Sequence, residues 1–254
     1  EQSAPEAPRL SAADELAHAN TLELCMNACF NMAEVMSGAA QDGMASLSLS
    51  AVELERVGDA YQERLREKLE GLVRVQLRDA QVPDDGGRGY DMDSEEYDRR
   101  GDGGVLTAFT RRWLLGSDWL PVHAKRGLTS SNHARLVEAF AEQLAERVME
   151  WILRTRFSEW GALLLSREVQ SLSTWLEGLQ EERVMRKSLR ALWAAGKLLT
   201  LDKPADAARY RICPDVVDEA TARRVLERRT EFSAELVAKS RLTAGAPAPA
   251  AAPA

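Results

Sequence analysis

The sequence predicts an all-α protein with about seven amphipathic helices. Apolar residues recur at steps of three and four along most of the chain, as they do on one face of a helix. Glycine and proline cluster in three places, whereas strands would be separated by such residues at short intervals. Aromatic residues make up only 6% of the 254 residues and charged residues 29%, which is typical of helical proteins. The 45% of hydrophobic residues suffice for a sizeable core.

Two long helices are predicted in the first third of the chain. Ser11 is a suitable N-cap because Asp14 follows three residues later, as in a capping box. The buried stripe predicted for this helix consists of Leu22, Cys25, Cys29, Met32 and Met36. The stretch SGAAQDG ends it, and a second helix with charged residues on its outer face continues to Pro83.

The middle of the chain contains one segment without any apolar period. Residues 83–104 are polar, acidic and rich in glycine, so we predict an exposed and mobile loop. Helices are then expected around 105–115 and from Thr129 or Ser130 onward. In the stretch FSEWGALLLS, the residues from Gly161 to Ser166 are predicted to form a joint, with Ser166 as the cap of a fresh helix.

The last third adds further helices and a tail. The seam predicted after the joint consists of Leu165, Val169, Leu172, Leu176 and Leu179. Another helix follows from about residue 182 to 201, and Asp218 is predicted to cap the last one. Residues after Leu242 are a low-complexity Ala/Pro tail without the means to pack.

These elements predict four segments. We expect a flexible leader at 1–10, a first helical bundle at 11–160 that includes the loop 83–104, a second and smaller bundle at 161–242, and a disordered tail at 243–254. The chain begins with Glu1 rather than Met and enters a well-patterned helix at about residue 10. We therefore also expect it to be a piece of a longer protein.

The sequence contains no pattern for catalysis, cofactor binding or metal binding. Phosphate-binding loops, dinucleotide fingerprints and nucleophile elbows are absent. Asp91, Asp93 and Glu95 alternate as in a calcium loop, but Glu96 occupies the position that requires glycine. We predict no catalytic residue, no cofactor and no metal. A further alternative is a helical metal-dependent hydrolase that uses the carboxylates of 91–102.

Charge is distributed unevenly along the chain. From Arg183 onward there are 14 Lys or Arg against 8 Asp or Glu, a balance of +6, whereas the preceding residues hold 19 against 32, a balance of −13. A basic last quarter is typical of regions that meet nucleic acid, anionic lipid or an acidic protein surface. The alternative is that these charges form solvated helix faces.

Several passages of the chain resemble the C-terminal region of the fourth subunit of the conserved oligomeric Golgi complex. The resemblance is carried by FSEWGALLLSREVQSLSTWL, by VMRKSLRALWAAGKLLTLD and by RRVLERRTEFSAELVAKSRL, in this order and spacing. It is strongest over 136–242 and weakest across 83–128. The matching positions are Phe157, Gly161, Arg167, Glu168, Val169, Ser171, Leu172, Arg186, Leu199, Leu201, Arg223, Val225, Leu226, Glu231 and Phe232.

This resemblance implies a fold and a function. It implies elongated helical bundles of the kind found in multisubunit tethering complexes, acting without catalysis at the cytosolic face of the Golgi membrane in intra-Golgi retrograde vesicle transport. It also implies partners, namely the sibling subunits, SNARE proteins and SNARE regulators, with only indirect or peripheral membrane contact and no nucleic acid. The alternative function is a helical nucleic-acid-binding module, or another adaptor, that uses the basic C-terminal quarter.

The candidate partner-binding residues lie on the two basic helices near the C-terminus, which this fold would bring together. They are Arg186, Arg190, Lys197, Arg223 and Arg224. The family pairs an arginine of the penultimate helix with an acid of the last one, but Ala191 and Thr221 stand at those positions here. Their neighbours Arg190 and Glu219 are the candidate replacement pair.

Overall fold

The computed structural model of the chain describes residues 11–42, 44–78, 80, 82, 89–101, 103–114, 124–179, 187–209 and 216–242. Regular structure in these residues is α-helical, apart from two isolated β-bridges. The predicted all-α helical fold is therefore confirmed. The predicted leader 1–10 and tail 243–254 lie outside the described residues.

The chain divides into two compact units. Unit 1 consists of Glu1–Arg78 and Asp118–Phe140, and unit 2 of Asp79–Ser117 and Ala141–Ala254. This division differs from the predicted boundary at 160/161, because a segment from the middle of the chain belongs to the same unit as the N-terminal helices.

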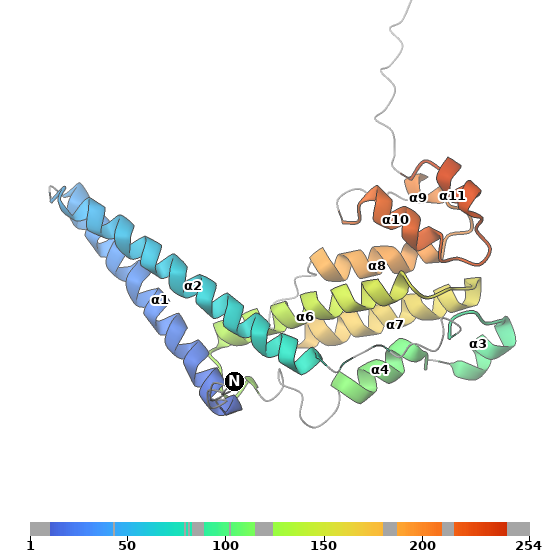
Figure 1. Cartoon of the computed structure of the whole chain (residues 1–254), viewed down its shortest axis with the longest axis horizontal. Coiled ribbons are helices and arrows are strands. Elements are labelled where there is room, and N and C mark those ends of the chain that lie inside the picture. Colours follow the sequence, from blue (N-terminus) through green and yellow to red (C-terminus); the bar gives the residue numbers. More distant parts are fainter. Residues whose placement is uncertain are drawn as a thin grey trace, which may run out of the picture. The chain divides into compact units, whose positions relative to one another are not determined.

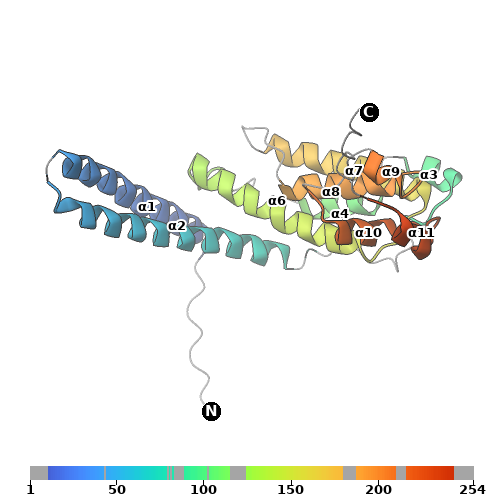
Figure 2. The ribbon, with the colours of Figure 1, turned by 90° about the horizontal axis from the view of Figure 1, so that it is seen from above.

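Unit 1 is built around a helical hairpin. Helices α1 (Ala12–Gln41) and α2 (Leu47–Leu77) run side by side (Figures 1 and 2). The predicted cap is confirmed, since Ser11 and Asp14 form a capping box at the start of α1. Farther along, Phe30 packs so closely on Gly58 that a Cβ at this glycine would lie 2.7 Å from the ring.

The buried stripe of α1 differs from the predicted one. Leu22, Met26 and Ala33 are buried, while Met32 is 52% exposed and Cys25 only half-buried. Of the predicted stripe, Leu22 is confirmed as buried, Cys25, Cys29 and Met36 are half-buried, and the prediction was wrong for Met32. Because α1 carries few charges, apolar periodicity did not identify its buried side accurately.

The N-terminal half of α1 is fixed by the segment that leads into α6 (Ser130–Ile152). Asn20 donates a hydrogen bond from Nδ2 to the Gly127 carbonyl at 2.9 Å. Thr129 donates to Glu23 at 2.5 Å and Asn132 to the Ala19 carbonyl at 3.2 Å. These polar contacts over more than a hundred residues of sequence explain why the segment belongs to unit 1.

Unit 2 gathers short helices around a pair of longer ones. Helix α7 (Glu159–Gly178) packs against α8 (Lys187–Leu199), and both α3 (Ser94–Arg100) and α4 (Val105–Leu114) contact α7. On the other side of the pair, α10 (Glu219–Leu226) contacts α8 and α11 (Ala234–Lys239), and α9 (Asp206–Arg209) lies between α8 and α10 in sequence (Figure 1). The predicted seam residues Leu165, Val169, Leu172 and Leu176 are all buried, whereas Leu179, the C-cap of α7, is only half-buried.

The prediction that 83–104 is an exposed loop was wrong for its described part. Tyr90 and Met92 are buried, and Asp93 caps α3, which contains the buried Tyr97. Their irregular spacing gives no helical period, because these side chains pack from an extended segment and a short helix of seven residues rather than from one long helix. Residues 83–88 and Asp102 lie outside the described residues.

The predicted joint at Gly161 to Ser166 was also wrong, because both residues lie inside α7 in unit 2. The break between helices comes earlier, and Ser158 is the N-cap, accepting a hydrogen bond from the Gly161 N–H at 3.2 Å. Gly161 is needed for another reason, since a Cβ there would lie 1.8 Å from the Tyr90 carbonyl oxygen.

Phe157 connects distant parts of unit 2. It forms isolated parallel bridges with both Tyr90 and Arg229. Its N–H donates to the Arg228 carbonyl at 2.9 Å, and the Thr230 N–H donates to its carbonyl at 2.9 Å. The turn before α7 thus joins the segment around Tyr90 to the one that follows α10.

Candidate functional site

One face of α8 presents basic and aromatic side chains to solvent. The opposite face is buried and includes Leu192, Ala195 and Leu199. Arg190, Trp193 and Lys197 are exposed at steps of three and four, so they share one side of the helix. Trp193 is 45% exposed, and the Lys197 Nζ lies 5.7 Å from the centre of its ring, within cation–π range. We call these three residues the α8 stripe.

The two candidate arginines of α10 have different surroundings. Arg224 is exposed. Arg223 instead donates from Nη1 to the carbonyls of Val237 at 2.8 Å and Ala238 at 3.1 Å, and from Nη2 to that of Ser240 at 3.2 Å. Because these carbonyls lie at the C-terminal end of α11, Arg223 caps that helix. The Arg223 guanidinium is therefore engaged in hydrogen bonds within the chain, and Arg224 is the more accessible of the two for a partner.

The candidate ion pair between Arg190 and Glu219 is not formed among the described residues. Glu219 instead pairs with Arg223 one turn later on α10, with 2.6 Å between Oε1 and Nη2. Arg186, the remaining candidate, lies outside the described residues. The structure therefore leaves Arg190, Lys197 and Arg224 as exposed candidates, and adds Trp193.

Sequence analysis missed Arg229, which fixes the C-terminal end of α8. Its side chain is only 4% exposed and donates from Nη1 to the carbonyls of Leu199 and Leu201. Its Nε donates to Glu231 at 2.8 Å, and its guanidinium lies 4.8 Å from the centre of the Phe232 ring. A buried arginine is tolerated because such partners surround it. Four arginines lie between residues 223 and 229, and no sequence signal distinguishes the buried one.

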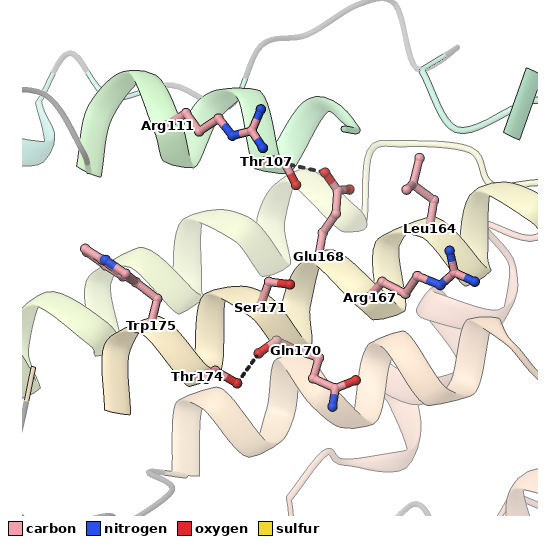
Figure 3. Close-up of a pocket in the computed structure, with 9 residues that line it drawn as sticks. All are labelled: Thr107, Arg111, Leu164, Arg167, Glu168, Gln170, Ser171, Thr174 and Trp175. Carbon is pink, nitrogen blue, oxygen red and sulfur yellow. Dashed lines mark hydrogen bonds between the residues drawn. The ribbon is translucent and has the colours of Figure 1, made fainter. Parts of the chain in front are cut away.

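A pocket of about 680 Å³ lies beside α4 and α7 in unit 2. Figure 3 shows Arg111 and Thr107 on the α4 side and Glu168, Ser171 and Trp175 on α7. The remaining lining residues are Leu164, Arg167, Gln170 and Thr174.

Glu168, the carboxylate among the lining residues, accepts hydrogen bonds that hold α4 in place. Glu168 accepts a hydrogen bond from the Thr107 N–H at 2.7 Å and another from the Tyr90 hydroxyl. The Leu106 N–H donates in turn to the Tyr90 oxygen at 3.1 Å. Leu106 and Thr107 are the second and third residues of α4, whose N–H groups have no partner within the helix. Glu168 and Tyr90 therefore cap α4 from a distance.

Burial changes the pKa of both the Glu168 carboxyl group and the Tyr90 hydroxyl group. It raises the pKa of Glu168 above its ordinary value, while the hydrogen bonds from Tyr90 and Thr107 oppose this rise. Burial, and then the neighbouring Glu168, raise the pKa of the Tyr90 hydroxyl well above its usual value. Tyr90 thus remains a hydrogen-bond donor at neutral pH.

The raised pKa of Glu168 predicts a pH effect on stability. A carboxyl group whose pKa is higher in the folded state binds protons more strongly there, so its contribution to stability is present at low pH and is lost as pH rises. We expect the unfolding free energy of the wild type, minus that of the Glu168→Gln variant, to fall from about pH 4.5, the ordinary pKa of the group, up to the folded-state pKa. Urea titrations at several pH values measure this difference. A difference that rises with pH would contradict the assignment.

The described part of the chain offers neither a metal site nor a membrane-spanning helix. No three His, Cys, Asp or Glu residues are gathered there in a way that could hold a metal ion. Nor does that part contain a helix with enough length and apolar character to cross a bilayer.

A comparison with protein families gives one result that bears on these observations. The family described as "Conserved oligomeric Golgi complex subunit 4, C-terminal" matches residues 39–217, more than half of the chain. The match includes α8 and its stripe and ends just before α10. A search of curated proteins gives no match.

Proposed function

The chain belongs to the family of the C-terminal region of conserved oligomeric Golgi complex subunit 4, a subunit of a Golgi tethering complex, and we propose that it acts there as a non-catalytic scaffold. In this proposal it serves intra-Golgi retrograde vesicle transport through contacts with sibling subunits and with SNARE proteins and their regulators. Its location is the cytosolic face of the Golgi membrane, with peripheral or indirect membrane contact.

The α8 stripe is the observation that carries the proposed mode of action. Trp and Arg are the side chains most enriched among residues that dominate binding energy in protein interfaces. Trp193 lies between two basic residues on a helix whose other face is buried, so the stripe is held in place before binding. Such preorganisation lowers the entropy lost when a partner docks.

The charge of the stripe specifies the partner's surface. Arg190 and Lys197 have no ion pair with an acidic residue in the described part of the chain. A partner surface with acidic groups around an apolar patch would therefore gain charge-assisted contacts without breaking existing ones. Arg224 on the neighbouring α10 adds to the positive charge of this unit.

Capture from detergent-solubilised Golgi membranes tests this proposal. The immobilised wild-type chain is expected to retain sibling subunits or SNAREs, identified by mass spectrometry. The Arg190→Glu/Lys197→Glu variant is expected to retain about tenfold less of these proteins, because two negative charges then face the acidic surface of the partner. The control is the Arg64→Glu/Arg74→Glu variant, which reverses two exposed charges on α2 in unit 1. Equal retention by all three chains would exclude the α8 stripe as the capture surface.

The same experiment distinguishes the nucleic-acid alternative. If retained material disappears after nuclease treatment, and binding to a nucleic-acid probe falls steeply with salt, the basic C-terminal quarter serves nucleic acid instead. Nuclease-resistant retention of Golgi proteins is the result that the scaffold proposal requires.

A further inference from the structure

The two helices of the unit 1 hairpin have very different outer surfaces. The outer surface of α2 is charged and joined by ion pairs within the helix, such as Arg56 with Glu53 and Arg66 with Glu63 and Glu70. Exposed apolar residues of α2, namely Leu49, Val52, Val57 and Val75, lie among these charges. Over its 30 residues α1 has four acidic residues and no Lys or Arg. Only one of the four, Glu34, is exposed in its second half.

The exposed side of α1 has a regular pattern. Residues at alternating steps of four and three are exposed and uncharged from 17 to 38: Ala17, Thr21, Leu24, Ala28, Asn31, Val35 and Gly38. Leu24 is 68% exposed and Val35 72%. The alternation has the spacing of a heptad seam, although only Leu24 and Val35 among these residues are large and apolar. The buried residues Ala19, Leu22, Met26 and Ala33 lie on the opposite side of the helix. We call this exposed pattern the α1 seam.

The flanks of the α1 seam differ from each other. On one side lie the polar Asn20, Asn27 and Glu34, and on the other the half-buried Cys25 and the exposed Met32. Met32 thus widens the apolar surface. Glu34 has no ion pair in the described part of the chain and lies beside Val35 and Asn31 at the edge of the seam.

From this pattern we infer that the α1 seam binds a helix of another protein, one with an apolar heptad seam and basic residues along its edge. A helix fits this surface because its own side chains, spaced at steps of three and four, can pack along a stripe of the same spacing. Its flank is basic because the charge at the edge of the α1 seam is Glu34. This surface is separate from the α8 stripe, so the inference goes beyond the proposed function.

The same charges argue against two other occupants. A second copy would bring acidic α1 against acidic α1 without any basic residue between them. An anionic membrane surface attracts helices with Lys and Arg beside their apolar face, and α1 has neither. Both occupants are outcomes that the following test would reveal.

The test uses the full chain and two synthetic helices of equal length. Both helices carry the same Leu/Ala seam, one with Lys and the other with Glu at the flanking positions, and fluorescence anisotropy measures binding. The Lys-flanked helix is expected to bind several-fold more tightly than the Glu-flanked one. In the Glu34→Lys variant this preference is expected to shrink or reverse, because the charge at the edge changes sign.

Neutral variants separate the seam from the overall acidity of the chain. Leu24→Gln/Val35→Gln keeps the net charge of −7, and we expect it to bind the Lys-flanked helix about tenfold more weakly, since two apolar contacts are lost. The control is Val52→Gln, a 58% exposed position on α2, with unchanged binding. Circular dichroism and thermal unfolding of these two variants and of Glu34→Lys should match those of the wild type, because the substituted side chains are exposed.

Alkylation of Cys25 provides a second readout. This thiol lies at the edge of the α1 seam and is half-buried, so the bound helix should slow its modification, as mapped by mass spectrometry. The inference is overturned if neither helix binds, or if the Leu24→Gln/Val35→Gln variant binds as the wild type does. It is also overturned if ultracentrifugation shows a wild-type dimer that this variant lacks, or if the chain binds anionic vesicles through the seam.

Discussion

Replacing Gly161 with alanine is expected to destabilise unit 2 by about 3 kcal/mol or more, because the added methyl group has no room. A Cβ at this position would lie 1.8 Å from the Tyr90 carbonyl oxygen and 2.6 Å from its carbon. These are backbone atoms, so a side-chain rotation cannot relieve the clash. The Tyr90 carbonyl also accepts from the Ser158 N–H at 2.9 Å, which ties the segment to the start of α7.

The consequences of this clash extend beyond one contact. The Tyr90 ring packs on those of Trp151 and Phe157, with 5.4 Å and 5.2 Å between ring centres. Its hydroxyl helps to cap α4. Moving Tyr90 away from α7 therefore disturbs an aromatic cluster and a helix cap together.

Urea unfolding followed by circular dichroism measures the effect of Gly161→Ala. The control is Gly71→Ala in α2, where nothing lies within 4 Å of an added Cβ. Alanine at an unhindered helical position should stabilise the chain by about 0.5–1 kcal/mol. If Gly161→Ala is as stable as the wild type, the close approach of the Tyr90 backbone to α7 is wrong.

Replacing Arg229 with methionine is expected to cost about 3 kcal/mol, because its buried polar partners lose their donor. Methionine fills a similar volume but cannot donate to the carbonyls of Leu199 and Leu201. It also leaves Glu231 without the arginine that now pairs with it at 2.8 Å. Since those carbonyls end α8, the helix that carries the α8 stripe would lose its C-terminal anchor.

A matched control separates burial from charge. Arg224→Met removes the same charge from an exposed position on α10, so its unfolding free energy should stay within about 0.5 kcal/mol of the wild type. Denaturant titrations of both variants provide the comparison. Equal, small changes would show that Arg229 contributes no more than a surface arginine.

Sequence predicted the elements that depend on local chemistry. The caps at Ser11 and Asp218 were predicted because a small polar residue before a helix leaves a recognisable spacing, and both accept the expected backbone hydrogen bonds. The seam of α7 was predicted because polar residues on its other face make the apolar period visible.

Features that depend on long-range packing could not be predicted. The burial of Tyr90 requires α7, whose Glu168 lies 78 residues away. Arg229 meets carbonyls about 30 residues earlier in the chain. Gly161 looks like a hinge in sequence because glycine serves both flexible joints and close backbone contacts, and the sequence does not show which of the two applies. Trp193 was missed as part of the candidate surface because an exposed and a buried tryptophan look alike in sequence.

We propose that this member of the family binds partner subunits directly through the α8 stripe. The most direct test is bio-layer interferometry between the purified chain and each purified sibling subunit or SNARE. The claim predicts saturable binding to at least one of them, weakened about tenfold by Arg190→Glu/Lys197→Glu and unchanged by Arg64→Glu/Arg74→Glu. Binding that is equal for all three chains, or absent for every sibling subunit and SNARE, would contradict it.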